Sequence, residues 1–270
     1  MQRVLMTGAA GGVGTMLRPL LKSTGYDVVL SDIKAPGQLS KDERFVATDL
    51  TRIEEVEKAC DGIDGILHFG GHSIEGTWDQ VHQANIMGCY NLFEAARRKG
   101  VQRIVFASSN HAVGFYPRTT HIGVDVVPRP DSRYGVSKVF GEALGALYAE
   151  KHGMRNSSLR IGNVDYKPID KRRLSIWLHP DDLMQLCRIG LEHPAIRYEV
   201  FYGASLNART WWDNSNAYRH GYRPKHRSED HVAHALAEQA KAPADPVGDF
   251  YQGGTFCAAE FTAPKTDIWS

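Results

Sequence analysis

Tyr134 and Lys138 stand four residues apart and together carry the groups of a general base. Residues at positions i and i+4 are neighbours on one face of a helix, so the phenol and the ammonium would lie side by side. A free tyrosine has a pKa near ~10 and is a poor base at neutral pH unless a nearby cation favours the phenolate. Lys138 would supply that charge. The spacing alone is also common on solvated helices, so the prediction of catalysis depends on what surrounds the pair.

A glycine-rich segment near the N-terminus has the spacing of a phosphate-binding turn. Residues 7 to 14 read TGAAGGVG and lie between an apolar run and an amphipathic one. In such a turn the first glycine permits a tight bend, the middle one lets the backbone approach a pyrophosphate, and the last permits close packing of helix on strand. The diphosphate would lie on the first N–H groups of the helix. A purely structural turn is the alternative. The residues predicted to hold the dinucleotide are Gly8, Gly11, Gly12, Val13 and Gly14.

Asp32 follows the second apolar run, at the position where such folds bind the adenosine ribose of a dinucleotide. A carboxylate at this position accepts hydrogen bonds from both ribose hydroxyls and repels a 2′-phosphate. The sequence therefore predicts NAD as the cofactor, in preference to NADP. Lys34 nearby could weaken the preference for NAD over NADP. The alternative role for Asp32 is that of a loop or helix-capping residue.

Short apolar runs alternate with amphipathic stretches over the first 165 residues. The runs are rich in Val, Ile, Leu and Phe and are bounded by Gly, Asp or Ser, as buried strands are. The stretches 13–23 and 78–99 have apolar residues at helical spacing. This alternation predicts an α/β fold, a Rossmann-type doubly wound parallel sheet. The predicted strands are Arg3–Met6, Asp27–Leu30, Arg44–Ala47, Gly65–Phe69, Arg103–Ala107 and Ser158–Ile161.

The alternation weakens after about residue 162, where Pro168 and a basic cluster interrupt it. Beyond this point we expect a helix that starts near Asp181, with Asp181 as its cap, a strand at 198–202 and a helix at 229–239. The predicted organisation is an NAD-binding Rossmann domain at 1–165 and a small C-terminal substrate-side lobe at 166–270 that is integrated with the same domain.

The composition argues against several classes of protein. The chain has 270 residues with 32 basic and 31 acidic side chains, and its net charge of +1 gives no field that would attract nucleic acid or a membrane surface. No apolar run approaches the ~20 residues of a membrane span, and the N-terminus opens on a strand-like segment instead of a signal peptide. We expect a cytoplasmic protein whose partner is a small molecule.

Neither the cysteines nor the histidines have the spacing of a metal site. Cys60, Cys89, Cys187 and Cys257 are scattered without a C-x-x-C pair and are predicted to be free thiols. His231 and His234 could share a helix face, but no motif supplies a third ligand. The sequence therefore predicts no metal.

Together these features resemble the short-chain dehydrogenase/reductase superfamily in its extended, sugar-modifying branch. The resemblance covers residues 1 to about 165 and includes the strand at 104–107 that runs into Ser108-Ser109-Asn110-His111. It implies that Ser109 hydrogen-bonds the reacting hydroxyl, that Tyr134 is the general acid/base, and that Lys138 lowers the pKa of the tyrosine and binds the nicotinamide ribose. It also places further residues on the cofactor, for which ordinary strand-end turns are the alternative: Asp49, Leu50, Phe69, Gly70 and Gly71.

A finer resemblance, over nearly the whole chain, is to the uronate dehydrogenase family. It rests on His72-Ser73, the run 108–116, the Arg-Ile-Gly segment 160–162, the basic segment near Arg172 and the late segment 253–256. That family oxidises the cyclic form of glucuronate or galacturonate at C1 with NAD, giving the aldarolactone and NADH. The resemblance implies that Arg172 engages the C6 carboxylate and that Phe256 closes over the ring. The implied contacts of the sugar are Ser73, Ser109, Asn110, His111, Tyr134, Arg172 and Phe256.

Several alternatives stay open. Lys171 or Arg173 could replace Arg172, because three adjacent bases are also typical of a solvated loop. Asn163, assigned to the cofactor side, stands where the family often has a serine, which leaves sugar and nicotinamide placement there unsettled. No residue distinguishes the two uronates. A homo-oligomer is expected from related enzymes.

Two other functions fit the cofactor half. A nucleotide-sugar epimerase or dehydratase would share it, but the chain has little length left for a nucleotide-binding lobe. A non-catalytic NAD-sensing regulator would have the same fold, but such proteins commonly lose the Tyr-x-x-x-Lys pair, which this chain keeps.

Overall fold

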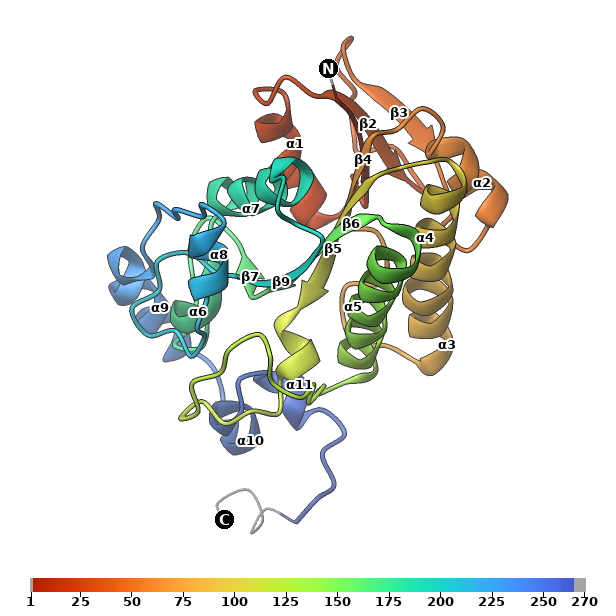
Figure 1. Cartoon of the computed structure of the whole chain (residues 1–270). Helices are drawn as coiled ribbons and strands as arrows, with labels where there is room; N and C mark the ends of the chain where they lie inside the picture. The colour runs from red at the N-terminus through yellow and green to blue at the C-terminus, as the bar shows by residue number, and fades with distance from the viewer. Residues whose placement is uncertain (1, 265–270) are drawn as a thin grey trace.

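A computed structural model describes residues 2–264 and is built around a seven-stranded sheet in which every neighbouring pair of strands is parallel (Figure 1). The strand order is β3-β2-β1-β4-β5-β6-β9, so the direction of winding reverses between β1 and β4. Ligands of such sheets bind outside the carboxyl ends of the strands at this switch point. The strands are β1 (Arg3–Thr7), β2 (Asp27–Asp32), β3 (Arg44–Ala47), β4 (Gly65–His68), β5 (Arg103–Ser109), β6 (Arg155–Ile161) and β9 (Tyr198–Gly203).

Helices bury both faces of the sheet (Figure 1). One face is covered by α1 (Gly12–Leu21) and α7 (Pro180–Glu192), whose Leu17 and Leu183 are buried in the core on that side. The other face is covered by α2 (Ile53–Ala59), α4 (Gly88–Arg98) and α5 (Arg133–His152), with Phe93 in the core. The central strands are almost continuously apolar because neither of their faces meets water. The predicted α/β class and doubly wound sheet are confirmed.

All six predicted strands are present, with ends that differ by at most three residues. The helix predicted at 78–99 is wrong in detail. It consists of α3 (Trp78–Val81), a π-helical segment (His82–Met87) and α4. The wider π turn directs Asn85 inward, where its Oδ1 accepts a hydrogen bond from His72 N at 2.7 Å and its Nδ2 donates to Ser137 Oγ at 3.0 Å. Such turns often lie at functional sites.

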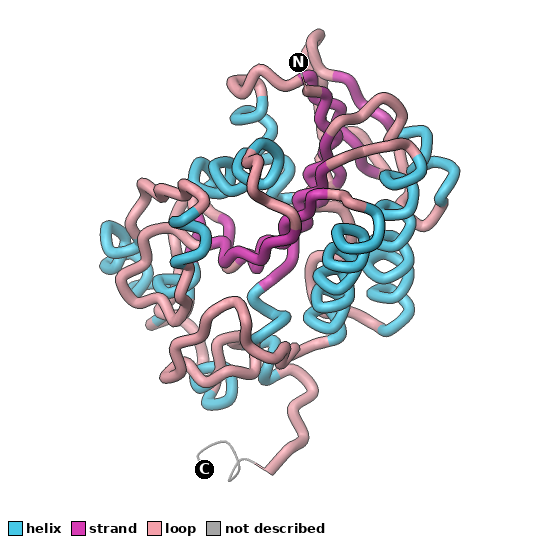
Figure 2. Tube along the Cα trace, in the orientation of Figure 1, coloured by secondary structure: helices cyan, strands magenta, loops and turns pink. Residues whose placement is uncertain are grey.

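One strand after residue 162 belongs to the same sheet. Strand β9 pairs with β6 over Asn156–Ile161, and β7 (Asn163–Val164) pairs with β8 (Trp177–Leu178) in a second, small sheet. Figure 2 shows how much of the remaining chain is loop. The boundary at residue 165 stays a prediction. The other helices are α6 (Arg173–Ile176), α8 (Ser215–Arg219), α9 (Val232–Gln239), α10 (Pro246–Phe250) and α11 (Thr255–Ala258), with 3-10 turns at Asn110–Val113 and Ser228–His231.

The late helices α10 and α11 pack against the loop that follows β5. Pro117 and Tyr251 form an antiparallel bridge, and Arg118 Nη2 donates a hydrogen bond to the Gly248 carbonyl at 2.6 Å. The carboxyl end of β5 is therefore enclosed by residues more than 100 positions later in the chain. Across the described residues, no helix has both the length and the apolar character needed to cross a bilayer.

Candidate active site

A cleft of about 680 Å³ lies at the carboxyl ends of β1, β2, β4, β5 and β6. This is the edge of the sheet at which the switch point predicts a ligand. The volume is in the range of small-molecule sites. Every residue predicted for the cofactor lines this cleft: Gly8, Gly11, Gly12, Val13, Gly14, Asp32, Asp49, Leu50, Phe69, Gly70, Gly71, Lys138 and Asn163.

The glycine turn has the close contacts that the spacing predicts. Gly8 has φ +74°, and a Cβ on it would lie 2.5 Å from the Phe69 carbonyl carbon. A Cβ on Gly14 would lie 2.2 Å from the Gly8 oxygen, whereas a Cβ on Gly12 would meet nothing within 4 Å. Helix α1 starts at Gly12 without a side-chain cap, so its first N–H groups remain available to an anion. These residues fit a dinucleotide diphosphate.

Asp32 is held in place at the end of β2. Its Oδ2 accepts a hydrogen bond from Ala10 N at 2.9 Å, and its Oδ1 accepts one from Ile33 N at 2.8 Å. The carboxylate therefore lies beside the glycine turn, where ribose hydroxyls would reach it. Arg18, in the second turn of α1, forms an ion pair with Glu43, so this guanidinium is already engaged and is not free to bind a 2′-phosphate.

Ser109, Tyr134 and Lys138 meet in the cleft. Ser109 is the last residue of β5, and its Oγ accepts a hydrogen bond from His111 N at 3.2 Å. Helix α5 begins after Ser132, whose hydroxyl accepts from Gly135 N at 2.9 Å, and this cap fixes the first turn that carries Tyr134. Lys138 Nζ lies 5.2 Å from the centre of the Tyr134 ring. The predicted side-by-side placement of phenol and ammonium is present.

Lys138 acts on the site as a buried cation. Its Nζ donates a hydrogen bond to the Ala107 carbonyl at 2.8 Å, and no carboxylate among the described residues pairs with it. Burial, and after it the charge of Lys138, lowers the pKa of His68 to about 3. His68 is thus a neutral ring whose Nδ1 is 2.7 Å from the Thr7 hydroxyl. Lys138 thus places a positive charge beside the Tyr134 ring.

The residues predicted for the sugar fall into two groups. Ser73, Ser109 and Tyr134 line the cleft. Asn110, His111, Arg172 and Phe256 do not line it but form a cluster against Tyr134. The His111 ring stacks on Phe256 with centroids 3.9 Å apart and meets Tyr134 edge-on at 5.8 Å. With the Asn110 amide turned so that its oxygen faces Arg172, Oδ1 accepts from Nη2 at 2.8 Å.

The three adjacent bases have different surroundings. Arg173 pairs with Asp170, and Lys171 is exposed. Arg172 is partly buried, and its Nε donates to the Gln252 carbonyl at 2.7 Å. Burial, followed by the charge of Arg173, lowers the pKa of Arg172 to about 10, so the guanidinium is still charged at neutral pH. No ion pair within residues 2–264 includes Arg172. Its position favours it over its two neighbours as the group that would bind an anion.

Sequence reasoning missed two acidic residues that hold this site together. Glu75 Oε2 accepts a hydrogen bond from Tyr134 N at 2.9 Å, and Asp131 Oδ2 lies 2.7 Å from His111 Nδ1. The position of Asp131 before the helix cap Ser132 was a visible signal for a turn. Nothing local in the sequence indicates the partner of either acid, because both contacts join segments at least 20 residues apart.

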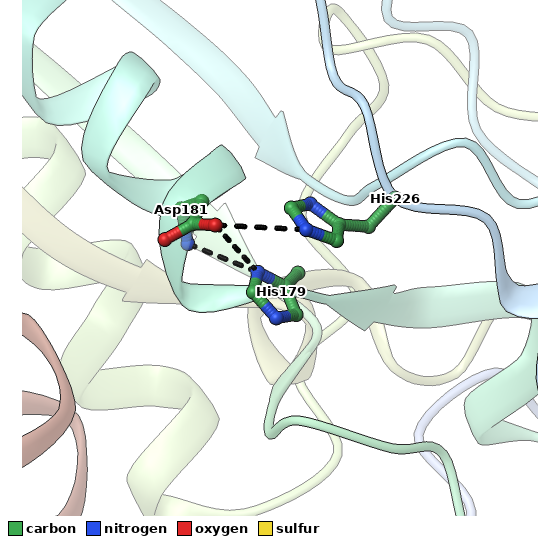
Figure 3. A group of neighbouring side chains, drawn as sticks. All are labelled: His179, Asp181 and His226. Carbon is green, nitrogen blue, oxygen red and sulfur yellow. Dashed lines mark hydrogen bonds and ion pairs between the residues drawn. The ribbon is translucent and has the colours of Figure 1, made fainter.

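A second cluster of ionisable side chains lies at the start of α7 (Figure 3). Oδ2 of Asp181 is 3.6 Å from both His179 Nδ1 and His226 Nε2. The two imidazoles are stacked, with centroids 3.5 Å and planes 15° apart, so one ion could not lie in the plane of both rings. His179 Nδ1 also accepts from Asp181 N at 3.2 Å. We interpret the cluster as a helix cap and assign no metal to it.

The cap of α7 is therefore His179, and the prediction of Asp181 as cap is wrong. Pro180 occupies the first helical position, where its missing N–H and fixed φ suit the start of a helix. This places Asp181 and Asp182 in the first turn, where their charges favour the helix dipole.

Comparison with known proteins places the chain among sugar-modifying enzymes. A family described as "NAD dependent epimerase/dehydratase family" matches residues 4–165. The uronate dehydrogenase of Pseudomonas putida is 42% identical over 95% of this chain and 96% of its own length.

Solved structures give the same result. The glucuronic acid dehydrogenase of Chromohalobacter salexigens superposes with a TM-score of 0.90 at 45% identity, over 95% of this chain and 97% of that one. A tyrosine-to-alanine mutant of the Agrobacterium tumefaciens uronate dehydrogenase, complexed with NAD, superposes with a TM-score of 0.90 at 41% identity, over 96% and 97% of the two chains. The similarity thus extends over both the cofactor half and the late segment.

Proposed function

Because the chain belongs to the NAD dependent epimerase/dehydratase family and, within it, to the uronate dehydrogenases, we propose that it oxidises a hexuronate at C1. Membership makes the protein an NAD-dependent oxidoreductase. The sugar, the atom oxidised and the roles of single residues are the proposal. The substrate would be the pyranose form of D-glucuronate or D-galacturonate, and the products would be the aldarolactone and NADH.

One observation carries the choice of a sugar acid, namely a partly buried guanidinium that forms no ion pair with an acidic side chain of residues 2–264. Arg172 is charged at neutral pH and touches only a backbone carbonyl and the Asn110 amide. A buried charge is costly until it is paired. A substrate carboxylate would give two parallel charge-assisted hydrogen bonds to the planar guanidinium. The Arg172 cluster abuts Tyr134 through His111 and Phe256, so an acid bound there would place its sugar ring at the catalytic tyrosine.

The proposed reaction assigns one task to each side chain. Tyr134, as the phenolate, removes the proton of the C1 hydroxyl, and Ser109 holds the same oxygen by a hydrogen bond. NAD, when bound, would supply the acceptor for the hydride that leaves C1, and C1 would become the lactone carbonyl carbon. Lys138 supplies positive charge beside the phenolate and reaches the ribose. The glycine turn and Asp32 bind the dinucleotide.

A spectrophotometric assay of NADH formation tests the proposal. The purified protein is given NAD with glucuronate, galacturonate, the neutral sugars glucose and galactose, glucose 6-phosphate and a nucleotide sugar. We expect kcat/KM for at least one uronate to exceed that for its neutral parent by about 10²-fold, the worth of two hydrogen bonds to a charged group. Turnover of the nucleotide sugar alone would replace the proposal by an epimerase or dehydratase. NAD binding without any turnover would indicate a regulator.

Two further expectations remain proposals about the whole protein. Assembly into a homo-oligomer is supported by large apolar side chains exposed on the adjacent helices α4 and α5, among them Tyr90, Val136 and Leu147. Light scattering on the purified protein measures the assembly. A cytoplasmic location is supported by the four buried, unpaired cysteines, and fractionation of the source cells tests it.

A further inference from the structure

We propose that Asp131 is a positioning residue of the active site, which holds the His111 imidazole in the tautomer whose Nε2 accepts a hydrogen bond from a sugar hydroxyl. The contact to the sugar rests on the proposed function. The contact between Asp131 and His111 does not, because it is a property of the protein alone.

The proton of the imidazole is placed by the chemistry of the pair. Asp131 Oδ2 is 2.7 Å from His111 Nδ1, and the Asp131 side chain is completely buried. A carboxylate only accepts hydrogen bonds, so Nδ1 must carry the hydrogen. Burial lowers the pKa of His111, which keeps the ring neutral at neutral pH. In a neutral ring with a hydrogen on Nδ1, Nε2 has a free lone pair and is an acceptor.

The neighbours of the imidazole leave Nε2 as its free functional atom. Phe256 stacks on the ring, and Tyr134 packs edge-on against it. His111 follows Ser109 by two residues in the turn that ends β5, and the side chain keeps 11% of its surface exposed. The imidazole therefore packs against Tyr134, and its backbone N–H donates to Ser109 Oγ, so it adjoins the two residues proposed to deprotonate and hold the C1 hydroxyl.

The fold makes room for a carboxylate at this position and for little else. A Cβ on Gly114 would lie 1.8 Å from Asp131 Oδ2, and a Cβ on Gly253 would lie 1.9 Å from it. On the other side, Ser132 Oγ donates a hydrogen bond to Oδ1 at 2.8 Å. Segments from three parts of the chain thus close around one acid, and the imidazole that it orients belongs to the substrate side of the site.

Asp131→Asn is the sharpest test, because it keeps the shape and removes the charge. The amide can donate to Nδ1, which would move the imidazole hydrogen to Nε2 and turn the acceptor into a donor. We expect kcat/KM for the uronate to fall about 10- to 100-fold, the size of effect seen when the orienting partners of metal-binding histidines are replaced. The dissociation constant of NADH should stay within about twofold. Asp125→Asn, which makes the same charge change at an exposed position of the same loop, is the matched control and should keep full activity.

A double-mutant cycle separates orientation from a general structural role. If Asp131 acts through His111, adding Asp131→Asn to His111→Ala should lower kcat/KM by less than about twofold. A fall in the His111→Ala background as large as in the wild type would overturn the proposal, because the acid would then act independently of the imidazole.

Imidazole ¹⁵N NMR of the wild type tests the tautomer without any substrate and without a variant of Asp131. The signals of His111 are identified by their loss in His111→Ala. We expect the hydrogen on Nδ1, and a hydrogen on Nε2 would contradict the proposal. If the tautomer is as expected but no uronate is oxidised, the positioning contact holds and the proposed function fails.

Discussion

A buried lysine, Lys138, and a partly buried arginine, Arg172, define the active site at the scale of single residues. Lys138 and Arg172 each touch backbone or amide oxygen but no carboxylate within the described part of the chain. Because an unpaired charge in a poorly hydrated site is unfavourable, each of them is satisfied only when an anion forms or arrives beside it. For Lys138 that anion would be the phenolate of Tyr134, and for Arg172 it would be the acid group of the sugar. The positive charges that would stabilise the phenolate and bind the sugar acid are thus in place before substrate binds.

Replacement of the phenol tests the first of these roles. Tyr134→Phe should lower kcat by roughly 10²–10⁴-fold, the usual contribution of a positioned general base, and should leave NAD binding intact. Steady-state kinetics with the preferred uronate give the measurement. Tyr148→Phe is the control, because it removes a buried hydroxyl that bonds to Glu94, far from the cleft. Near-normal turnover by Tyr134→Phe would refute the base.

Replacement of the guanidinium tests the second role. Arg172→Gln should raise KM for the uronate about 10- to 100-fold, because hydrogen bonds to a charged group are lost, with a smaller change in kcat. Lys171→Gln alters the neighbouring exposed base and should change neither constant. A larger effect of Lys171→Gln than of Arg172→Gln would transfer the role to Lys171.

At the scale of elements, the turn between β1 and α1 combines a steric and a binding requirement. Gly14 lets the helix approach the strand, whereas Gly12 faces open space at the phosphate position. We predict that Gly14→Ala lowers stability by about 1–3 kcal/mol, the usual cost of forcing an extra methyl into packed surroundings. Gly12→Ala should keep the stability and weaken NAD binding. Thermal unfolding and NADH titration of both variants separate the two requirements. Equal melting temperatures of Gly14→Ala and Gly12→Ala would contradict the steric role of Gly14.

Elements whose signals are local in sequence are the ones that could be predicted. The glycine turn, Asp32 and the Tyr134–Lys138 helix follow from short spacings, and the structure brings them to one cleft. The π turn at 82–87 could not be predicted, because the apolar spacing continues on both sides of it. Asp131 and Glu75 could not be found either, since each is defined by a partner from another segment of the chain.

At the scale of the whole molecule, acid should weaken the fold through His68, which lies buried at the end of β4. Its pKa is about 3 in the folded chain and about 6.5 when exposed. The unfolded chain therefore takes up the proton first, and the stabilisation present above pH ~6.5 is lost as the pH falls toward 3. Glu94, whose hydrogen bonds with Arg97 lower its pKa to about 2, adds a loss that begins only below about pH 4.5.

Urea titrations between pH 7 and 4 measure this decline. In His68→Gln the free energy of unfolding should be lower at pH 7 and should change less with pH than in the wild type. His234→Gln replaces an exposed histidine and should leave the slope unchanged. Parallel pH curves for His68→Gln and the wild type would contradict the role of His68.

Because β9 is an edge strand of the sheet and comes late in the chain, the sheet cannot be completed until β9 has been synthesised. Strand β6 ends at Ile161, and the strand that covers its open side begins only at Tyr198. While the ribosome adds the residues between them, β6 is the free edge of a growing sheet and can pair with a neighbouring chain. The dinucleotide turn is synthesised well before Phe256, so the cofactor half of a nascent chain can form before the residue expected to close over the sugar is present.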